Sequence, residues 1–224
     1  MKLLTLAWYV LRSLFLRGPV AGVAILLHEK RGDLKYGINT RGLVLQSADG
    51  TKHYQGASYY VLEKLFAAIK LYDLPRSFFD IGCGMGRVLI VAQGKGFLKC
   101  TGIDINAELI AAAKKNLSSA RCNQQAIEVL TGDASTFNYP KQAQLYFLFN
   151  PFDEKVLLKC LQKIEQESSE VNYFLYMNPV HHAVFENLGY QQLTAIKTGF
   201  YTEAILYKRS KLGKCIHFSG LAFN

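Results

Sequence analysis

Three glycines at alternate positions follow a short apolar run and could hold a ligand: Gly82, Gly84 and Gly86. Glycine lets the backbone turn sharply and approach a ligand with no side chain in between. A helix that begins just after the glycines would point its positive end at that ligand. A dinucleotide site needs the spacing G-x-G-x-x-G, but Arg87 stands in place of the third glycine. Asp80, just before the loop, would repel a pyrophosphate and suits the cationic amino-acid part of a ligand. A plain tight turn is the alternative.

Two acidic residues follow later apolar runs. Asp104 comes 22 residues after Gly82 and can accept hydrogen bonds from two adjacent ribose hydroxyls. Alternatively, Asp104 caps the next helix, but Asn106 is better placed for that task and leaves Asp104 free. Asp133 can accept the exocyclic amine of adenine while the Ala134 backbone approaches the ring, although an Asp after a Gly is also a common turn.

A fourth polar position opens the sequence Asn150-Pro151-Phe152. The Asn150 side chain, or the carbonyl of the Asn-Pro bond, can accept a hydrogen bond from an amine, and Phe152 can stack beside that amine. The alternative is a turn that only ends a strand. The residues alone favour neither hypothesis over the other.

The elements that must position these residues alternate along the chain. Strands are expected at 77–81, 100–105, 127–131, 144–149, 172–177, 190–196 and 202–207. Helices are expected at 58–71, 87–93, 107–117, 154–166 and 180–188. This pattern predicts an α/β fold with a single, doubly wound, mostly parallel sheet and a C-terminal antiparallel hairpin. The polar residues then meet at the carboxyl edge of the sheet, where such folds bind ligands.

In this order, the four signals resemble the class I S-adenosylmethionine-dependent methyltransferases, whose fold is Rossmann-like, over residues 58–208. The resemblance implies S-adenosyl-L-methionine as cofactor and S-adenosyl-L-homocysteine as product. It assigns cofactor contacts to residues at the four strand ends, namely Asp80, Gly82, Cys83, Gly84, Gly86, Asp104, Ile105, Asp133, Ala134 and Asn150. Asn150 and Phe152 are the catalytic, acceptor-side candidates. Because the sulfonium is already activated, the enzyme needs no metal and no protein nucleophile.

The fourth motif departs from the family members that methylate adenine or glutamine. Those proteins carry Asn-Pro-Pro followed by an aromatic residue, whereas Phe152 here comes one place early and is followed by Asp153. This weakens the assignment to a nucleobase amine. A narrower resemblance, to small bacterial methyltransferases without an assigned substrate, rests on residues 36–40, 53–60, 150–152 and 178–181.

Two further groups of residues are candidates for supporting roles. The resemblance implies a lid over the cofactor from the segment before the first strand, with Tyr54, Gln55 and Tyr59. His181 and His182 follow a second Asn-Pro pair. One of them could act as a general base near neutral pH, but a solvated helix cap is the more common role.

The composition suits one folded domain in a reducing compartment. The 224 residues allow one sizeable core. The net charge of +9 favours an acidic partner such as nucleic acid, an anionic membrane or an acidic protein, unless it only reflects a basic surface. The five cysteines form no CxxC pair, which speaks against a disulfide framework or a zinc site and favours the cytoplasm.

Residues 1–57 are expected to form an apolar helical segment followed by an irregular connector or lid from Gly32, ahead of a cofactor-binding domain at 58–224. Arg12 and Arg17 interrupt the apolar run, so no stretch is long enough to span a bilayer. Residues 1–28 are expected to pack on the domain or on a protein partner, or to lie on a membrane surface.

Three functions compete at this stage. The first is a methyltransferase that acts on a protein or small-molecule amine. The second is a methyltransferase for rRNA, tRNA or DNA, which the basic charge favours and the absence of a recognisable nucleic-acid-binding module disfavours. The third is a domain that binds S-adenosylmethionine without catalysis.

Overall fold

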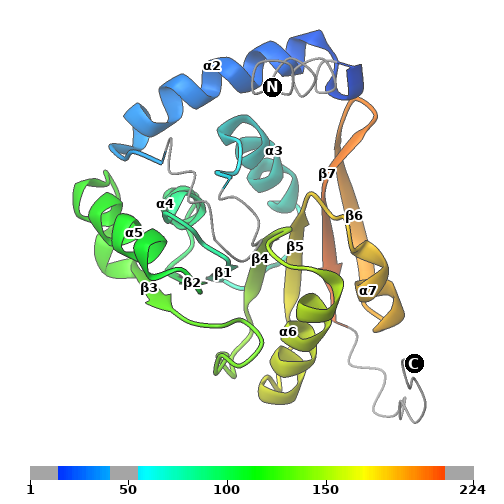
Figure 1. Cartoon of the computed structure of the whole chain (residues 1–224). Coiled ribbons are helices and arrows are strands. Elements are labelled where there is room, and N and C mark those ends of the chain that lie inside the picture. The colour runs from blue at the N-terminus through cyan, green and yellow to red at the C-terminus, as the bar shows by residue number, and fades with distance from the viewer. Residues whose placement is uncertain (1–14, 41–54, 210–224) are drawn as a thin grey trace, which may run out of the picture.

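The computed structural model describes residues 15–40 and 55–209. Seven strands form one sheet in the order β3-β2-β1-β4-β5-β7-β6 (Figure 1). Their bounds are β1 Ser77–Ile81, β2 Lys99–Asp104, β3 Ile127–Thr131, β4 Leu145–Phe149, β5 Tyr173–Met177, β6 Gln191–Thr198 and β7 Tyr201–Lys208. Each predicted strand is present, with bounds that shift by two residues or fewer.

The first five strands are parallel, and the last two are not. β7 pairs antiparallel with both β5 and β6. The predicted fold class is therefore confirmed. Strand order reverses between β1 and β4, and ligands of such sheets bind at the carboxyl ends of the strands beside that point.

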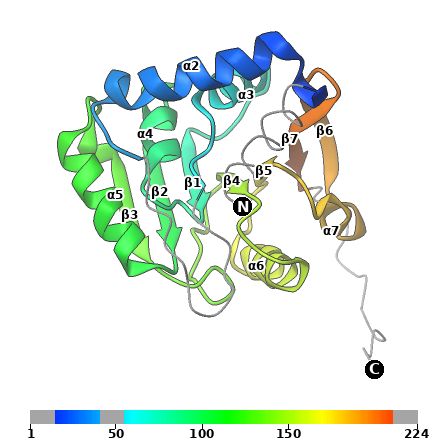
Figure 2. The ribbon, with the colours of Figure 1, turned by 45° about the horizontal axis from the view of Figure 1, so that its top comes forward.

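Helices cover both faces of the sheet (Figure 2). The first face carries α3 Tyr59–Ile69, α4 Arg87–Gly94 and α5 Ala107–Ser119, and the second carries α6 Glu154–Glu167 and α7 His182–Asn187. A short 3-10 turn, η1 Gln124–Ala126, precedes β3. Successive strand residues point to opposite faces, so Phe78 packs with the first group and its neighbour Phe79 with the second.

One more helix, α2 Pro19–Tyr36, lies outside α3 and α4 and extends from the β6–β7 turn to α5 (Figures 1 and 2). The expectation of an irregular connector from Gly32 is wrong for its first residues, because the helix continues to Tyr36. Gly32 serves close packing there, since a Cβ atom on it would lie 2.1 Å from the Tyr59 ring. Gly37 ends the helix in the left-handed conformation.

Within the described residues, no helix has the length and apolar character needed to cross a bilayer. Residues 41–54, which hold most of the expected connector, lie outside the described residues, and the division of the chain near residue 57 stays a prediction.

Candidate functional site

The glycine loop joins the end of β1 to the start of α4. The backbone N–H groups of Gly82 and Cys83 both donate to the carbonyl oxygen of Ile103 on β2, at 2.9 Å each. Gly86 donates to the Cys83 carbonyl and precedes α4 as its N-cap residue, with a φ of 81°. Gly82 and Gly84 also have positive φ, at 82° and 52°. The loop is thus fixed by β2 in a shape that favours glycine.

Pro151 closes against this loop from the neighbouring strand end. A Cβ atom on Gly82 would lie 2.8 Å from the Cβ of Pro151, which is closer than real Cβ contacts come. The end of β1 and the end of β4 are therefore in direct contact. Two of the four motifs predicted from the sequence meet at this point.

Asp80 lies on β1 with 2% of its surface exposed. Its Oδ2 atom accepts no hydrogen bond from the described residues. Burial, and after it the charge of Asp104, raises the pKa of the Asp80 carboxyl well above its usual range. A buried carboxyl oxygen without a donor is costly until a donor or a cation meets it. The orphaned oxygen fits the positively charged amino-acid end of S-adenosylmethionine.

Asp104 at the end of β2 does not cap α5, as the sequence predicted, but both of its carboxylate oxygens accept backbone hydrogen bonds. Its Oδ2 accepts the N–H of Gly84 and its Oδ1 accepts the N–H of Asn106, at 2.9 Å each. Burial raises the pKa of the Asp104 carboxyl, against the lowering effect of these two donors. Each oxygen has a second lone pair for a ligand hydroxyl. The predicted cap is confirmed, because Asn106 Oδ1 accepts the N–H groups of Glu108 and Leu109.

The adenine-side candidates differ in their exposure. Ile105 is 70% exposed, which leaves an apolar side chain open beside Asp104. Asp133 is exposed, and its Oδ1 accepts the N–H and the hydroxyl of Ser135 at 2.8 Å each, so it forms a local turn. Ala134 is buried, and its carbonyl oxygen accepts the Tyr139 hydroxyl at 2.7 Å.

Asn150 has a φ of 41°, a conformation that is uncommon outside glycine and that asparagine adopts more readily than most residues. Its Oδ1 accepts a hydrogen bond from the Tyr176 hydroxyl on β5 at 3.1 Å. The Tyr176 oxygen in turn accepts the N–H of His181 at 3.3 Å. Phe152 is half-buried and packs against the core of the second face. The side chain of Asn150 is thus oriented by a buried tyrosine.

The second Asn-Pro pair repeats this arrangement at the end of β5. Asn178 has a φ of 50°, and its Oδ1 accepts the Tyr201 hydroxyl at 2.6 Å. The Arg17 guanidinium lies 4.2 Å from the centre of the Tyr201 ring and pairs with the buried Glu203. The sequence indicated the Asn-Pro pair but not its tyrosine, which comes 23 residues later.

The two histidines beside this pair differ in position. His181 is half-buried and precedes α7 as its N-cap residue. His182 is exposed, and its Nδ1 lies 3.1 Å from Glu186 Oε1 one helical turn later. The His181 side chain makes no capping hydrogen bond to α7, so neither the cap nor the general-base role predicted from the sequence is tested by these contacts.

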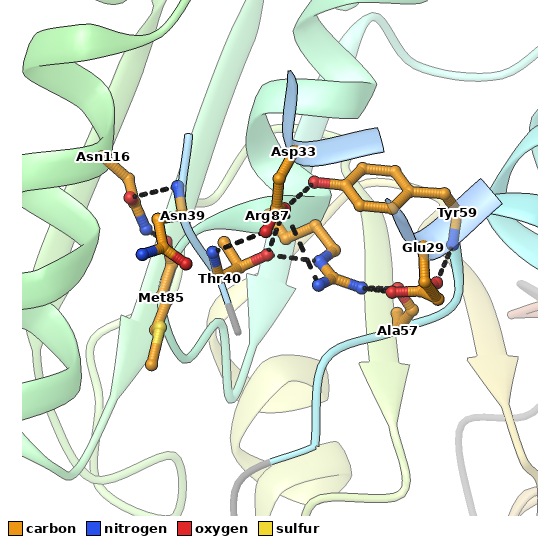
Figure 3. Close-up of polar contacts among 9 residues, drawn as sticks. All are labelled: Glu29, Asp33, Asn39, Thr40, Ala57, Tyr59, Met85, Arg87 and Asn116. Carbon is orange, nitrogen blue, oxygen red and sulfur yellow. Dashed lines mark hydrogen bonds and ion pairs between the residues drawn. The ribbon is translucent and has the colours of Figure 1, made fainter. Parts of the chain in front are cut away.

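Sequence reasoning missed the network around Arg87, the first residue of α4 (Figure 3). The guanidinium is buried and donates to Glu29, to the Thr40 hydroxyl and to the Ala57 carbonyl at 2.7–2.8 Å. Asp33 lies 3.8 Å away. These contacts tie α2 and the chain after it to the start of α4. An arginine directly after a glycine loop was the available signal, but its acidic partners lie more than 50 residues away in the sequence.

The three residues predicted to form a lid do not lie together in the described structure. Tyr59 is buried under α2, where its hydroxyl donates to Asp33 at 2.6 Å, so its ring is part of this network and not a lid. Gln55 is exposed, and Tyr54 lies outside the described residues.

Residues 78–167 match a family model described as a methyltransferase domain, and this stretch holds the glycine loop and Asn150. Ajmaline N-methyltransferase from Rauvolfia serpentina is 27% identical over 93 residues, which make up 42% of this chain and 29% of the plant protein. The match thus spans less than a third of that relative.

Two solved structures share the fold. A SAM-dependent methyltransferase from Aquifex aeolicus is similar with a TM-score of 0.53 and 16% identity, over 66% of this chain and 88% of its own. The glycopeptide N-methyltransferase MtfA, solved with S-adenosylmethionine, is similar with a TM-score of 0.54 and 13% identity. The match covers 73% of this chain and 98% of MtfA.

Proposed function

We propose, from the premise that this chain carries a methyltransferase domain of the S-adenosylmethionine-dependent class, that it transfers the methyl group of S-adenosylmethionine to an amine of a small molecule or protein. The observation that carries the cofactor assignment is the buried Asp80 carboxyl, whose Oδ2 has no partner among the described residues beside a loop of three glycines with positive φ. A cationic amino acid would supply the missing partner.

The other cofactor roles follow the strand ends. Gly82, Cys83, Gly84 and Gly86 would face the amino-acid part, where no side chain bars the approach. Asp104 would accept the ribose hydroxyls with its remaining lone pairs. Ile105 and Ala134 would flank the adenine ring, and Asp133 would accept its exocyclic amine. The cofactor supplies an activated methyl group, so the protein has to align the acceptor and exclude water.

Asn150 and Phe152 are the proposed acceptor-side residues. Asn150 Oδ1 already accepts the Tyr176 hydroxyl, which leaves a lone pair for one N–H of a neutral acceptor amine. That hydrogen bond would fix the direction of the nitrogen lone pair. Phe152 would limit water beside it. The plant relative is named as an N-methyltransferase, which supports a nitrogen acceptor.

Transfer of a labelled methyl group tests this proposal. The full chain is incubated with methyl-labelled S-adenosylmethionine and with separate pools of small amines, protein and RNA. We expect label in an amine or protein pool, and loss of that label with Asn150→Ala at saturating cofactor. The cofactor affinity of the variant is measured separately, because Asn150 is also a predicted cofactor contact. Label in the RNA pool alone would overturn the amine assignment. Cofactor binding without transfer to any pool would favour a non-catalytic domain.

A further inference from the structure

The outer side of α2 carries an apolar stripe that nothing in the described structure covers. Val20, Val23, Leu27 and Leu34 are between 50% and 82% exposed. At about 100° per residue the four positions fall within an arc of roughly 60° on the helix. The opposite side of the same helix packs inward through Ala21, Gly32 and Tyr36. Adjacent exposed apolar residues in one line mark an interaction surface.

Two exposed phenylalanines lie near the N-terminal end of α2. Phe15 is 81% exposed, and Phe200, in the β6–β7 turn, is 91% exposed. The N–H of Phe200 donates to the Leu16 carbonyl at 2.9 Å, which holds the turn beside the start of the helix. Exposed aromatic rings next to an apolar helix face are typical of segments that insert at a lipid interface.

The charge around the stripe is positive. The acidic residues of α2 are Glu29 and Asp33, and both point inward to Arg87 (Figure 3). Arg31 is exposed at the C-terminal half of the helix, and Lys35 and Lys95 share the single carboxylate of Glu63.

The sequence before Glu29 adds to the positive charge. Residues 1–28 contain Lys2, Arg12 and Arg17 and no acidic residue. A second copy of this chain would bring the same positive charge to the stripe and repel it. An anionic lipid surface complements both the apolar line and its charge.

We propose that the outer face of α2, with Phe15 and Phe200, binds the surface of an anionic lipid bilayer. The binding is peripheral: apolar side chains enter the interface while the exposed Arg31 meets the headgroups. This proposal is argued from the exposure and charge of α2 and does not rest on the proposed methyl transfer.

Co-sedimentation of the full chain with vesicles tests the proposal. We expect binding to phosphatidylcholine vesicles that contain about one third phosphatidylglycerol, at least about tenfold weaker binding to pure phosphatidylcholine, and release at high salt. The double variant Val23→Glu/Leu27→Glu should bind at least about tenfold less. Phe200→Glu tests the turn by itself.

Leu71→Glu is the matched control, because Leu71 is 88% exposed at the end of α3, away from the stripe. It should bind vesicles like the wild type. Circular dichroism and thermal unfolding check that each variant folds. Absence of binding to anionic vesicles, equal losses in the control, or a wild-type dimer in light scattering that Val23→Glu/Leu27→Glu converts to a monomer would overturn the proposal.

Discussion

Gly82 and Pro151 lie so close that a Cβ atom on the glycine would be 2.8 Å from the Cβ of the proline. The glycine belongs to the loop after β1 and the proline to the turn after β4, on strands that are neighbours in the sheet. One contact thus fixes the proposed cofactor loop against the proposed acceptor-side turn. A side chain at position 82 must separate the two.

The first prediction concerns this contact. Gly82→Ala should lower the free energy of unfolding by about 1–2 kcal/mol for the positive φ and by a further ~1–3 kcal/mol for the overlap with Pro151, and it should abolish cofactor binding. Gly96→Ala is the matched control, because Gly96 has a φ of 100° and no atom within 4 Å of an added Cβ. In urea denaturation, Gly96→Ala should lose only the free energy of unfolding that comes from the positive φ. Equal losses in the two variants would remove the packing argument.

The second prediction concerns the effect of the Asp80 carboxyl on the stability of the protein. Its folded-state pKa is raised by burial, so the folded state holds the proton more tightly than the unfolded state, and stability falls as pH rises between the two pKa values. Asp80→Asn should therefore unfold at a higher temperature than the wild type at neutral pH, by the equivalent of about 1–3 kcal/mol. The difference should shrink near pH 4. A variant that is less stable than the wild type at neutral pH would contradict this account.

The third prediction links the same residue to the cofactor. A cationic ligand favours the charged carboxylate, so binding of S-adenosylmethionine should release protons, and its affinity should rise with pH until Asp80 is ionised in the free protein. Calorimetry in two buffers with different ionisation enthalpies measures the released protons. Asp80→Asn should bind more weakly and lose the proton release. Proton uptake by the wild type would have the wrong sign.

The fourth prediction separates the two tyrosines behind the Asn-Pro pairs. Tyr176→Phe removes the donor to Asn150 and should lower kcat by about 10- to 100-fold by misplacing the acceptor, with the Kd for the cofactor unchanged. Tyr201→Phe removes the matching donor to Asn178 and should leave kcat within a few-fold of the wild type. Steady-state kinetics with the identified acceptor make the comparison. The hypothesis fails if the two variants have the same kcat.

The fifth prediction concerns Arg87. Arg87→Met leaves the charges of Glu29 and Asp33 without their buried partner and should lower the free energy of unfolding by about 3–5 kcal/mol. Arg76→Met, at an exposed position, should change it by about 0.5 kcal/mol or less. Addition of Asp33→Asn to Arg87→Met should recover part of the loss. No recovery would mean that the ion pairs do not account for the cost.

The sequence predicted the features that depend on residues close together in the chain. The glycine loop, the cap at Asn106 and the strand ends at Ile81 and Thr131 depend on neighbours within a few residues, and the structure has them where they were expected. Gly32 misled because a glycine inside a helix and a glycine in a loop look alike until the ring that packs on it is known.

Contacts between residues far apart in the chain could not be predicted from the sequence. Arg87 meets Glu29 across 58 residues and Tyr176 meets Asn150 across 26, and nothing in the local sequence pairs them. Asp104 accepts one N–H from its near neighbour Asn106 and one from Gly84, 20 residues earlier, and the local sequence gives no sign of the second contact. The contacts of Asn150 and Asp104 are set by the order of the strands in the sheet, and that of Arg87 by the packing of α2 over the start of α4.

The most direct test is a calorimetric titration of the purified protein with S-adenosylmethionine and, separately, with NADH, repeated on Asp104→Ala. The account predicts that S-adenosylmethionine binds with a Kd in the micromolar range, that NADH does not bind, and that the variant loses the binding. Binding of NADH, or binding of S-adenosylmethionine that Asp104→Ala leaves unchanged, would contradict the proposed site.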